Sequence, residues 1–158
     1  MTLYETIEND IKTALKAGDT ARRSVLTVLK AAVKNKALEA RLDKAAMPED
    51  ALVEEVARTE VKKRRDAAGQ YRTGGRGDMA LQEEREISVL MAYLPPQMTE
   101  IEIEALLREI IPAVALTGEK DFGKVMAQVT QKTKGKADGT LVAQIVKRQI
   151  MAYNESAR

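Results

Sequence analysis

The chain contains 158 residues, of which 44% are hydrophobic, so it is long enough for one domain or two small ones and apolar enough to form a packed core. It contains no histidine and no cysteine, which excludes disulfides, thiolate nucleophiles, Ser-His-Asp triads and zinc sites built from His or Cys. Its net charge, 26 − 24 = +2, is too small to indicate a nucleic-acid partner by itself.

The first residues, MTLYETIEND, are acidic and lack the apolar core of a signal peptide. No apolar run reaches the ~20 residues that a helix needs to span a bilayer. We therefore expect a cytoplasmic protein that does not enter a membrane. The sequence also has no ATP-binding loop and no cluster of metal ligands, so we expect neither a cofactor nor a metal.

The N-terminal part predicts four helices, because apolar side chains recur at the spacing of one helix face. Gly18 is suited to end the first helix, and the second must stop before Pro48. The third helix breaks at TGGRG (73–77), and Asp78 is the expected N-cap of the fourth. The predicted helices cover about 2–17, 20–44, 48 to either 68 or 71, and 78–94.

The segment LPPQMT then marks a boundary, because two adjacent prolines cannot continue a helix. Thr99 and Glu102 predict a capping box for a fifth helix, which Pro112 kinks or ends. Two further helices are expected at about 122–133 and 139–153.

These elements predict an all-α fold, in which a four-helix unit joins a three-helix unit through a Pro-Pro linker. The C-terminal unit is close to the lower size limit for independent folding. The predicted parts are a helical N-terminal domain at 1–94, a linker at 95–98 and a C-terminal domain at 99–158.

Charge is unevenly distributed along the chain. Residues 120–148 and residues 58–76 each hold seven bases against two acids, a net charge of +5, whereas residues 95–119 hold one base against five acids. Such stretches are either solvated faces balanced by nearby acids or patches that bind phosphate, and the sequence leaves both readings open. The candidate RNA-binding residues of the earlier stretch share one helix face: Arg58, Lys62 and Arg65.

The stretch DFGKVMAQVTQKTKGKADG begins with letters that bind a metal in protein kinases. A kinase also needs a glycine-rich loop and a histidine-containing catalytic loop, which this chain lacks, so we expect a helix junction instead. Asp121 is then the N-cap of one helix, Gly135 ends it, and Asp138 caps the next. The lysines around the glycine turn are Lys132, Lys134 and Lys136. They belong either to a plain junction or to a site for phosphate.

Three stretches together carry a resemblance to a known family. They are KDFGKVMAQVTQKTKGKADGTLVAQIVK (120–147), ALKAGDTARRSVLTVLKAAVKNK (14–36) and EVKKRRDAAGQYRTGGRGDMALQEEREISVLMAYLPPQMTE (60–100). The first closely resembles the signature of the GatB/YqeY family, and the other two resemble its stand-alone bacterial form. The resemblance implies an all-α protein with a three-helix C-terminal part, in line with the helices predicted above.

The resemblance also implies a connection with tRNA. In the glutamine-dependent tRNA amidotransferase, the related tail domain of the B subunit contacts the outer corner of the tRNA. Lys120, Gly123 and Lys124 match the start of that motif, and the KGKAD segment at 134–138 matches its turn. Gly139 agrees with the stand-alone form. On this basis the lysines are expected to contact RNA phosphates, and Gly135 and Asp138 to shape the turn.

Three functions remain in competition. The first is a non-catalytic protein that binds tRNA through the Lys-rich junction, with help from 58–76. The second is a helical adaptor that docks on an amidotransferase or an aminoacyl-tRNA synthetase, suggested by the acidic fifth helix. The third is the family label of a carbon–nitrogen ligase that uses glutamine as amide donor. We expect no such activity from this chain, because acyl transfer needs an activated nucleophile and the sequence offers no constellation for one.

Overall fold

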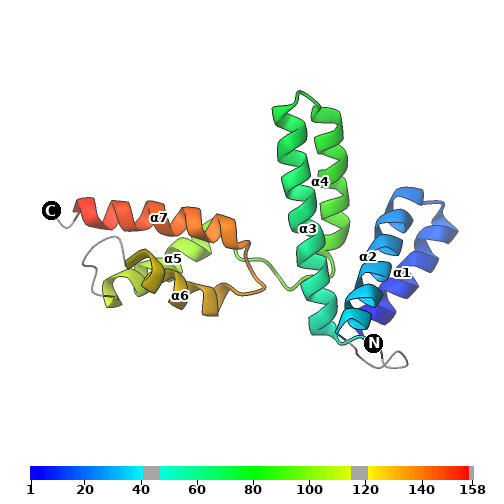
Figure 1. The fold of residues 1–158 in the computed structure, drawn as a ribbon, viewed down its shortest axis with the longest axis horizontal. Helices are drawn as coiled ribbons and strands as arrows, with labels where there is room; N and C mark the ends of the chain where they lie inside the picture. Colours follow the sequence, from blue (N-terminus) through cyan, green and yellow to red (C-terminus); the bar gives the residue numbers. More distant parts are fainter. Residues whose placement is uncertain (41–46, 115–120, 157–158) are drawn as a thin grey trace. The chain divides into compact units, whose positions relative to one another are not determined.

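The computed structural model describes residues 1–40, 47–114 and 121–156. Over these residues the chain forms seven helices and no strand, which confirms the predicted all-α fold. The helices gather into two compact units, Met1–Pro95 and Pro96–Arg158. In chain order (Figure 1) they are α1 (Leu3–Ala17), α2 (Thr20–Glu39), α3 (Asp50–Thr73), α4 (Gly77–Met91), α5 (Glu100–Ala113), α6 (Asp121–Thr133) and α7 (Gly139–Ser156).

The first unit consists of two helical hairpins, α1–α2 and α3–α4 (Figure 1). Gly18 ends α1 with a φ of 69°, the left-handed conformation expected at this position. α2 ends at Glu39, before the predicted position 44, and residues 41–46 lie outside the described part of the chain. One core, which includes Ile7, Leu26 and Tyr93, joins the four helices.

The N-termini of α1 and α3 meet at a shared cap. Thr2 and Glu5 form a capping box at the start of α1. The Leu3 amide donates to the Asp50 carboxylate at 2.8 Å, so the first turn of α3 also satisfies a free amide of α1. The carboxylate of Asp50 is favourable here because it lies at the positive ends of two helices.

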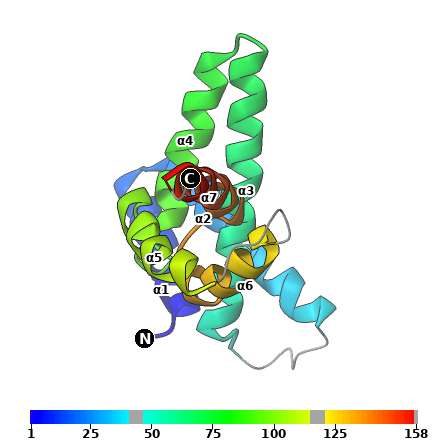
Figure 2. The same cartoon turned by 90° about the vertical axis from the view of Figure 1, so that its left-hand side faces the viewer.

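α3 and α4 run side by side and extend beyond the ends of α1 and α2 (Figures 1 and 2). The turn between them contains Gly75 at φ 74°. α4 begins at Gly77, so the prediction that Asp78 caps this helix was wrong. Asp78 lies in the first turn of α4 and pairs with Arg76 at 3.3 Å, where its charge favours the helix end without occupying the cap position.

The second unit is a bundle of α5, α6 and α7 around its own core, which includes Ile103, Val125 and Ile145. The capping box of Thr99 and Glu102 is present, as predicted. Pro112 lies inside α5, which ends one residue later at Ala113.

Candidate nucleic-acid interface

The junction between α6 and α7 is a tight turn fixed by backbone hydrogen bonds. Gly135 adopts φ 79°, a conformation that favours glycine. The amides of Lys136 and Ala137 both donate to the Thr133 carbonyl, at 2.8 and 3.1 Å. This pattern returns the chain on itself directly after α6, so the lysines on both sides of Gly135 are held close together.

The start of α7 is capped by Asp138, whose carboxylate accepts the Leu141 amide at 3.3 Å. Asp121 was predicted to be the N-cap of α6, but it is the first residue of the helix, one position later than a cap. Its side chain is buried. A side chain at Gly123 or Gly139 would meet no atom within 4 Å. No described neighbour therefore requires a glycine at either position for close packing.

The lysines of the junction differ in their partners. Lys124 lies 3.9 Å from the Asp121 carboxylate, measured from Nζ to Oδ1. Lys120 lies outside the residues that the structure describes. Three exposed lysines have no carboxylate within ion-pair distance in the described part of the chain, namely Lys132, Lys134 and Lys136. Their charges are therefore available to an anion.

The linker residues bind directly to this turn. The Met98 amide donates to the Lys136 carbonyl at 2.7 Å, and the Gln97 side chain donates to the Gly135 carbonyl at 3.2 Å. Both bonds hold the lysine-bearing turn against the start of the second unit. The sequence did not predict them, because they join residues 38 positions apart and no local pattern reports such a pairing.

The acids of α5 are partly used inside the second unit. Arg148 of α7 pairs with Glu100 and also with Glu104, the latter at 3.1 Å. Lys147 lies 5.5 Å from the centre of the Phe122 ring, a distance typical of a cation–π contact. The net charge of −4 over 95–119 is thus partly offset by a base from the +5 stretch.

The basic stretch of α3 separates into paired and unpaired side chains. Lys63, Arg64, Arg72 and Arg76 each form an ion pair with a carboxylate. Arg58, Lys62 and Arg65 form none with any residue that the structure describes. These three were the candidates that the sequence singled out on one helix face, and Lys62 and Arg65 are exposed.

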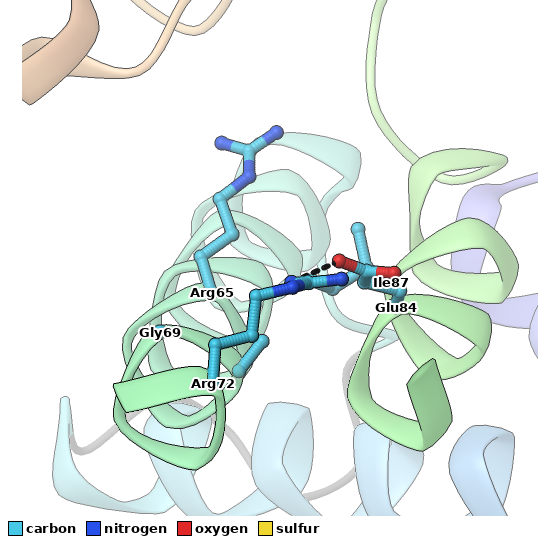
Figure 3. A pocket seen from close by; sticks show the side chains of 6 residues that line it. Arg65, Gly69, Arg72, Glu84 and Ile87 are labelled. Carbon is cyan, nitrogen blue, oxygen red and sulfur yellow. Dashed lines mark ion pairs between the residues drawn. The ribbon is translucent and has the colours of Figure 1, made fainter. Parts of the chain in front are cut away.

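A shallow groove of about 370 Å³ runs between α3 and α4 beside this face (Figure 3). Arg72 crosses it to Glu84 at 2.5 Å, whereas Arg65 extends away from that pair. Sequence reasoning did not find the groove, because its two sides come from different helices. It is lined by Arg65, Ala68, Gly69, Arg72, Glu84 and Ile87.

Comparison with known families then identifies the chain. Residues 4–150 match the sequence profile of the family described as Yqey-like protein. The chain belongs to the YqeY-like family. Because the match spans both units, it covers the Lys-rich junction and the α3–α4 hairpin alike. A search of curated proteins found no match.

Metal-binding clusters and membrane-spanning helices are both absent from the described part of this YqeY-like chain. Among the residues that the structure covers, no group of three or more His, Cys, Asp or Glu could hold a metal ion. Within the same ranges, none of the helices has the length and apolar character needed to cross a membrane.

Proposed function

We propose that this YqeY-like protein binds tRNA without catalysing a reaction of its own. The observation that supports the proposal best is the cluster of Lys132, Lys134 and Lys136, exposed around one turn and without carboxylate partners in the described chain. Lysines that neutralise phosphates release counterions from the nucleic acid, which favours binding. The resemblance of this turn to an RNA-contacting tail domain suggests tRNA as the RNA.

The lysine side chains are better suited to bind phosphate than the helix end beside them. The N-terminus of a free helix offers backbone amides to an anion. In α7 the Asp138 carboxylate already accepts one of these amides, from Leu141, and its negative charge would repel a phosphate there. The contacts should therefore be ion pairs from Lys134 and Lys136 to the RNA backbone, which carry little sequence information.

Salt-dependent affinity tests the proposal. We expect tRNA affinity to fall with rising salt, and the double change Lys134→Ala and Lys136→Ala to weaken it. Each lost phosphate contact should make the slope of log K against log salt shallower by up to about 0.9. The matched control is Lys12→Ala with Lys16→Ala on α1, which removes the same charge from outside both basic stretches.

Two results would contradict this function. The first is no tRNA binding even at low salt. The second is an equal loss of affinity in the α1 control, which would show that the change in net charge alone explains the weaker binding. Turnover of misacylated tRNA with glutamine and ATP, copurifying with the protein, would overturn the statement that it is non-catalytic.

A second candidate function is an adaptor that binds an amidotransferase or an aminoacyl-tRNA synthetase. It is favoured by large apolar side chains exposed on the second unit, since Ile101 of α5 is 75% exposed and Met151 of α7 is 64% exposed. Its test is capture of such an enzyme by the wild-type protein, with loss of capture on Ile101→Ser. Capture that persists in this variant would count against the adaptor surface.

A further inference from the structure

Gly69 is a glycine that the fold does not need. It lies inside α3, where glycine is a poor helix former, and its backbone does not have a positive φ. A side-chain carbon at this position would meet no atom within 4 Å, so no neighbouring helix packs against the missing side chain. Neither backbone conformation nor close packing therefore explains why glycine stands here.

Gly69 does line the groove between α3 and α4 (Figure 3). It lies between Arg65 and Arg72, at positions i, i+4 and i+7 of one helix face, so the two arginines leave α3 about 10 Å apart along its axis. A side chain at position 69 would project into the open space between them. The missing side chain leaves room above the helix between the two arginines of the groove, whose lining also includes Glu84.

The two arginines differ in their present partners. Arg65 has no carboxylate partner among the described residues, and its guanidinium points away from the Arg72–Glu84 pair (Figure 3). Arg72 pairs with Glu84 across the groove, and both side chains are about half exposed, 52% and 42%. Exposed ion pairs are weak, so Arg72 can exchange Glu84 for another anion at little cost.

We propose that this groove binds a phosphate of an RNA backbone, which lies over Gly69 between Arg65 and Arg72. Guanidinium groups bind phosphate oxygens with paired hydrogen bonds, and Glu84 competes with the phosphate for Arg72. The unpaired bases Arg58 and Lys62 continue along α3 and suit the neighbouring phosphates of the same strand. The identification of the anion as RNA rests on the function proposed above, whereas the groove as an anion site rests on its own geometry.

Two substitutions with opposite effects test the groove in the full-length protein. Gly69→Leu places a side chain in this space, where its Cβ meets no atom within 4 Å, and should weaken binding of a short RNA duplex about fivefold or more. Glu84→Gln removes the competing carboxylate and should tighten binding about two- to fivefold. The matched controls are Gln70→Leu, which places the same side chain outside the groove lining, and Glu83→Gln, which removes the same charge. Thermal unfolding of Gly69→Leu should show a fold at least as stable as the wild type, because leucine favours helix.

A titration with inorganic phosphate, followed by the side-chain NMR signals of Arg65 and Arg72, separates RNA from free phosphate. The proposal is supported if phosphate shifts the NMR signals of both arginines and if Gly69→Leu and Glu84→Gln change RNA affinity in opposite directions. Phosphate-induced shifts without an effect of either variant on RNA affinity would overturn the RNA assignment. If the variants and their controls change RNA affinity equally, the groove is not the binding site.

The groove and the lysine turn can fail separately. If Lys134→Ala with Lys136→Ala weakens RNA binding but the groove variants do not, the groove proposal fails alone. If the groove variants change RNA affinity and the lysine variants do not, the groove proposal is supported and the lysine turn is not the RNA contact. If no RNA binds at low salt, both fail.

Discussion

Two glycines of the first unit differ in whether their backbone conformation favours glycine. Gly18 adopts φ 69° at the end of α1, a conformation that costs a residue with a side chain about 1–2 kcal/mol. Gly69 lies in the interior of α3 with ordinary helical geometry and open space where a side chain would start. The same substitution should therefore change stability in opposite directions at the two positions.

Gly18→Ala should lower the free energy of unfolding by about 1 kcal/mol, because alanine is strained in the left-handed conformation. Gly69→Ala should raise it by about 0.5–1 kcal/mol, because alanine reduces the freedom of the unfolded chain and fits the helix. Urea unfolding of the two variants and the wild type measures both values. Changes of the same sign in both variants would show that the local backbone does not decide these effects.

At the scale of elements, Arg64 links α3 to α4 by an ion pair and is far less exposed than Arg72, which also does so. Its Nε donates to Glu86 at 2.8 Å and its Nη1 to the Glu60 carboxylate at 2.7 Å. The side chains of Arg64 and Glu60 are only 13% and 11% exposed, so this pair is far less solvated than the rest of the charged run. Removal of Arg64 would leave the largely buried Glu60 carboxylate with only the exposed Lys63 as an ion-pair partner among the described residues.

We therefore expect Arg64→Ala to lower the free energy of unfolding by about 2–4 kcal/mol. Arg65→Ala, at the adjacent position, removes an exposed and unpaired base and should change it by less than about 0.5 kcal/mol. Chemical unfolding of both variants makes the comparison. Similar losses in the two would contradict a specific role for the Arg64 link.

Glu60 of the same cluster is expected to make the stability of the fold sensitive to acid. Burial opposes ionisation of Glu60, but hydrogen bonds from Arg64 and Lys63 outweigh it and lower the pKa of this carboxyl below its ordinary 4.5. A lowered folded-state pKa gives stability that is present above pH 4.5 and is lost as pH falls through the folded value. The stability of Glu60→Gln should consequently fall less steeply below pH 4.5 than that of the wild type. An unchanged slope in a pH series of urea unfolding would contradict this contribution.

Helices and caps could be predicted from the sequence because their signals are local. Gly18, the Thr99–Glu102 box and the Lys–Gly turn each depend on residues within a few positions of one another. The Asp50–Leu3 cap and the Gln97–Gly135 bond join residues 47 and 38 positions apart, and only the packed structure brings them together. For the same reason the sequence singled out Arg65 by its helix face but did not show that Arg64 is paired, because Glu86, one of its two partners, lies on another helix.

At the scale of the whole molecule, each unit has its own hydrophobic core, and none of the core residues is shared between the two clusters. Bases that form no ion pair with a described residue also occur in both units, on α3 and at the α6–α7 turn. The folding of each unit and the phosphate binding proposed for it can thus be tested one unit at a time.

We expect residues 96–158, produced alone, to fold into a helical bundle with cooperative thermal unfolding. Its stability should be only a few kcal/mol, about 3–5, because a unit of this size buries a small core. Circular dichroism during heating makes the measurement, with Val125→Asp as the control that should abolish the transition. A broad, non-cooperative loss of helix would show that this unit depends on the first.

The hydrogen bond from Met98 to the Lys136 carbonyl has a consequence for the strength of any RNA complex. Leu94 packs against the first core, and Gln97 and Met98 are hydrogen-bonded to the α6–α7 turn, so Pro95 and Pro96 form the tether between the units. The three residue steps from Leu94 to Gln97 span at most about 11 Å. If both cationic surfaces bind RNA as proposed, a duplex held by one unit keeps the other unit at a high effective concentration. Lengthening this tether should then weaken RNA binding although the proposed contact residues stay unchanged.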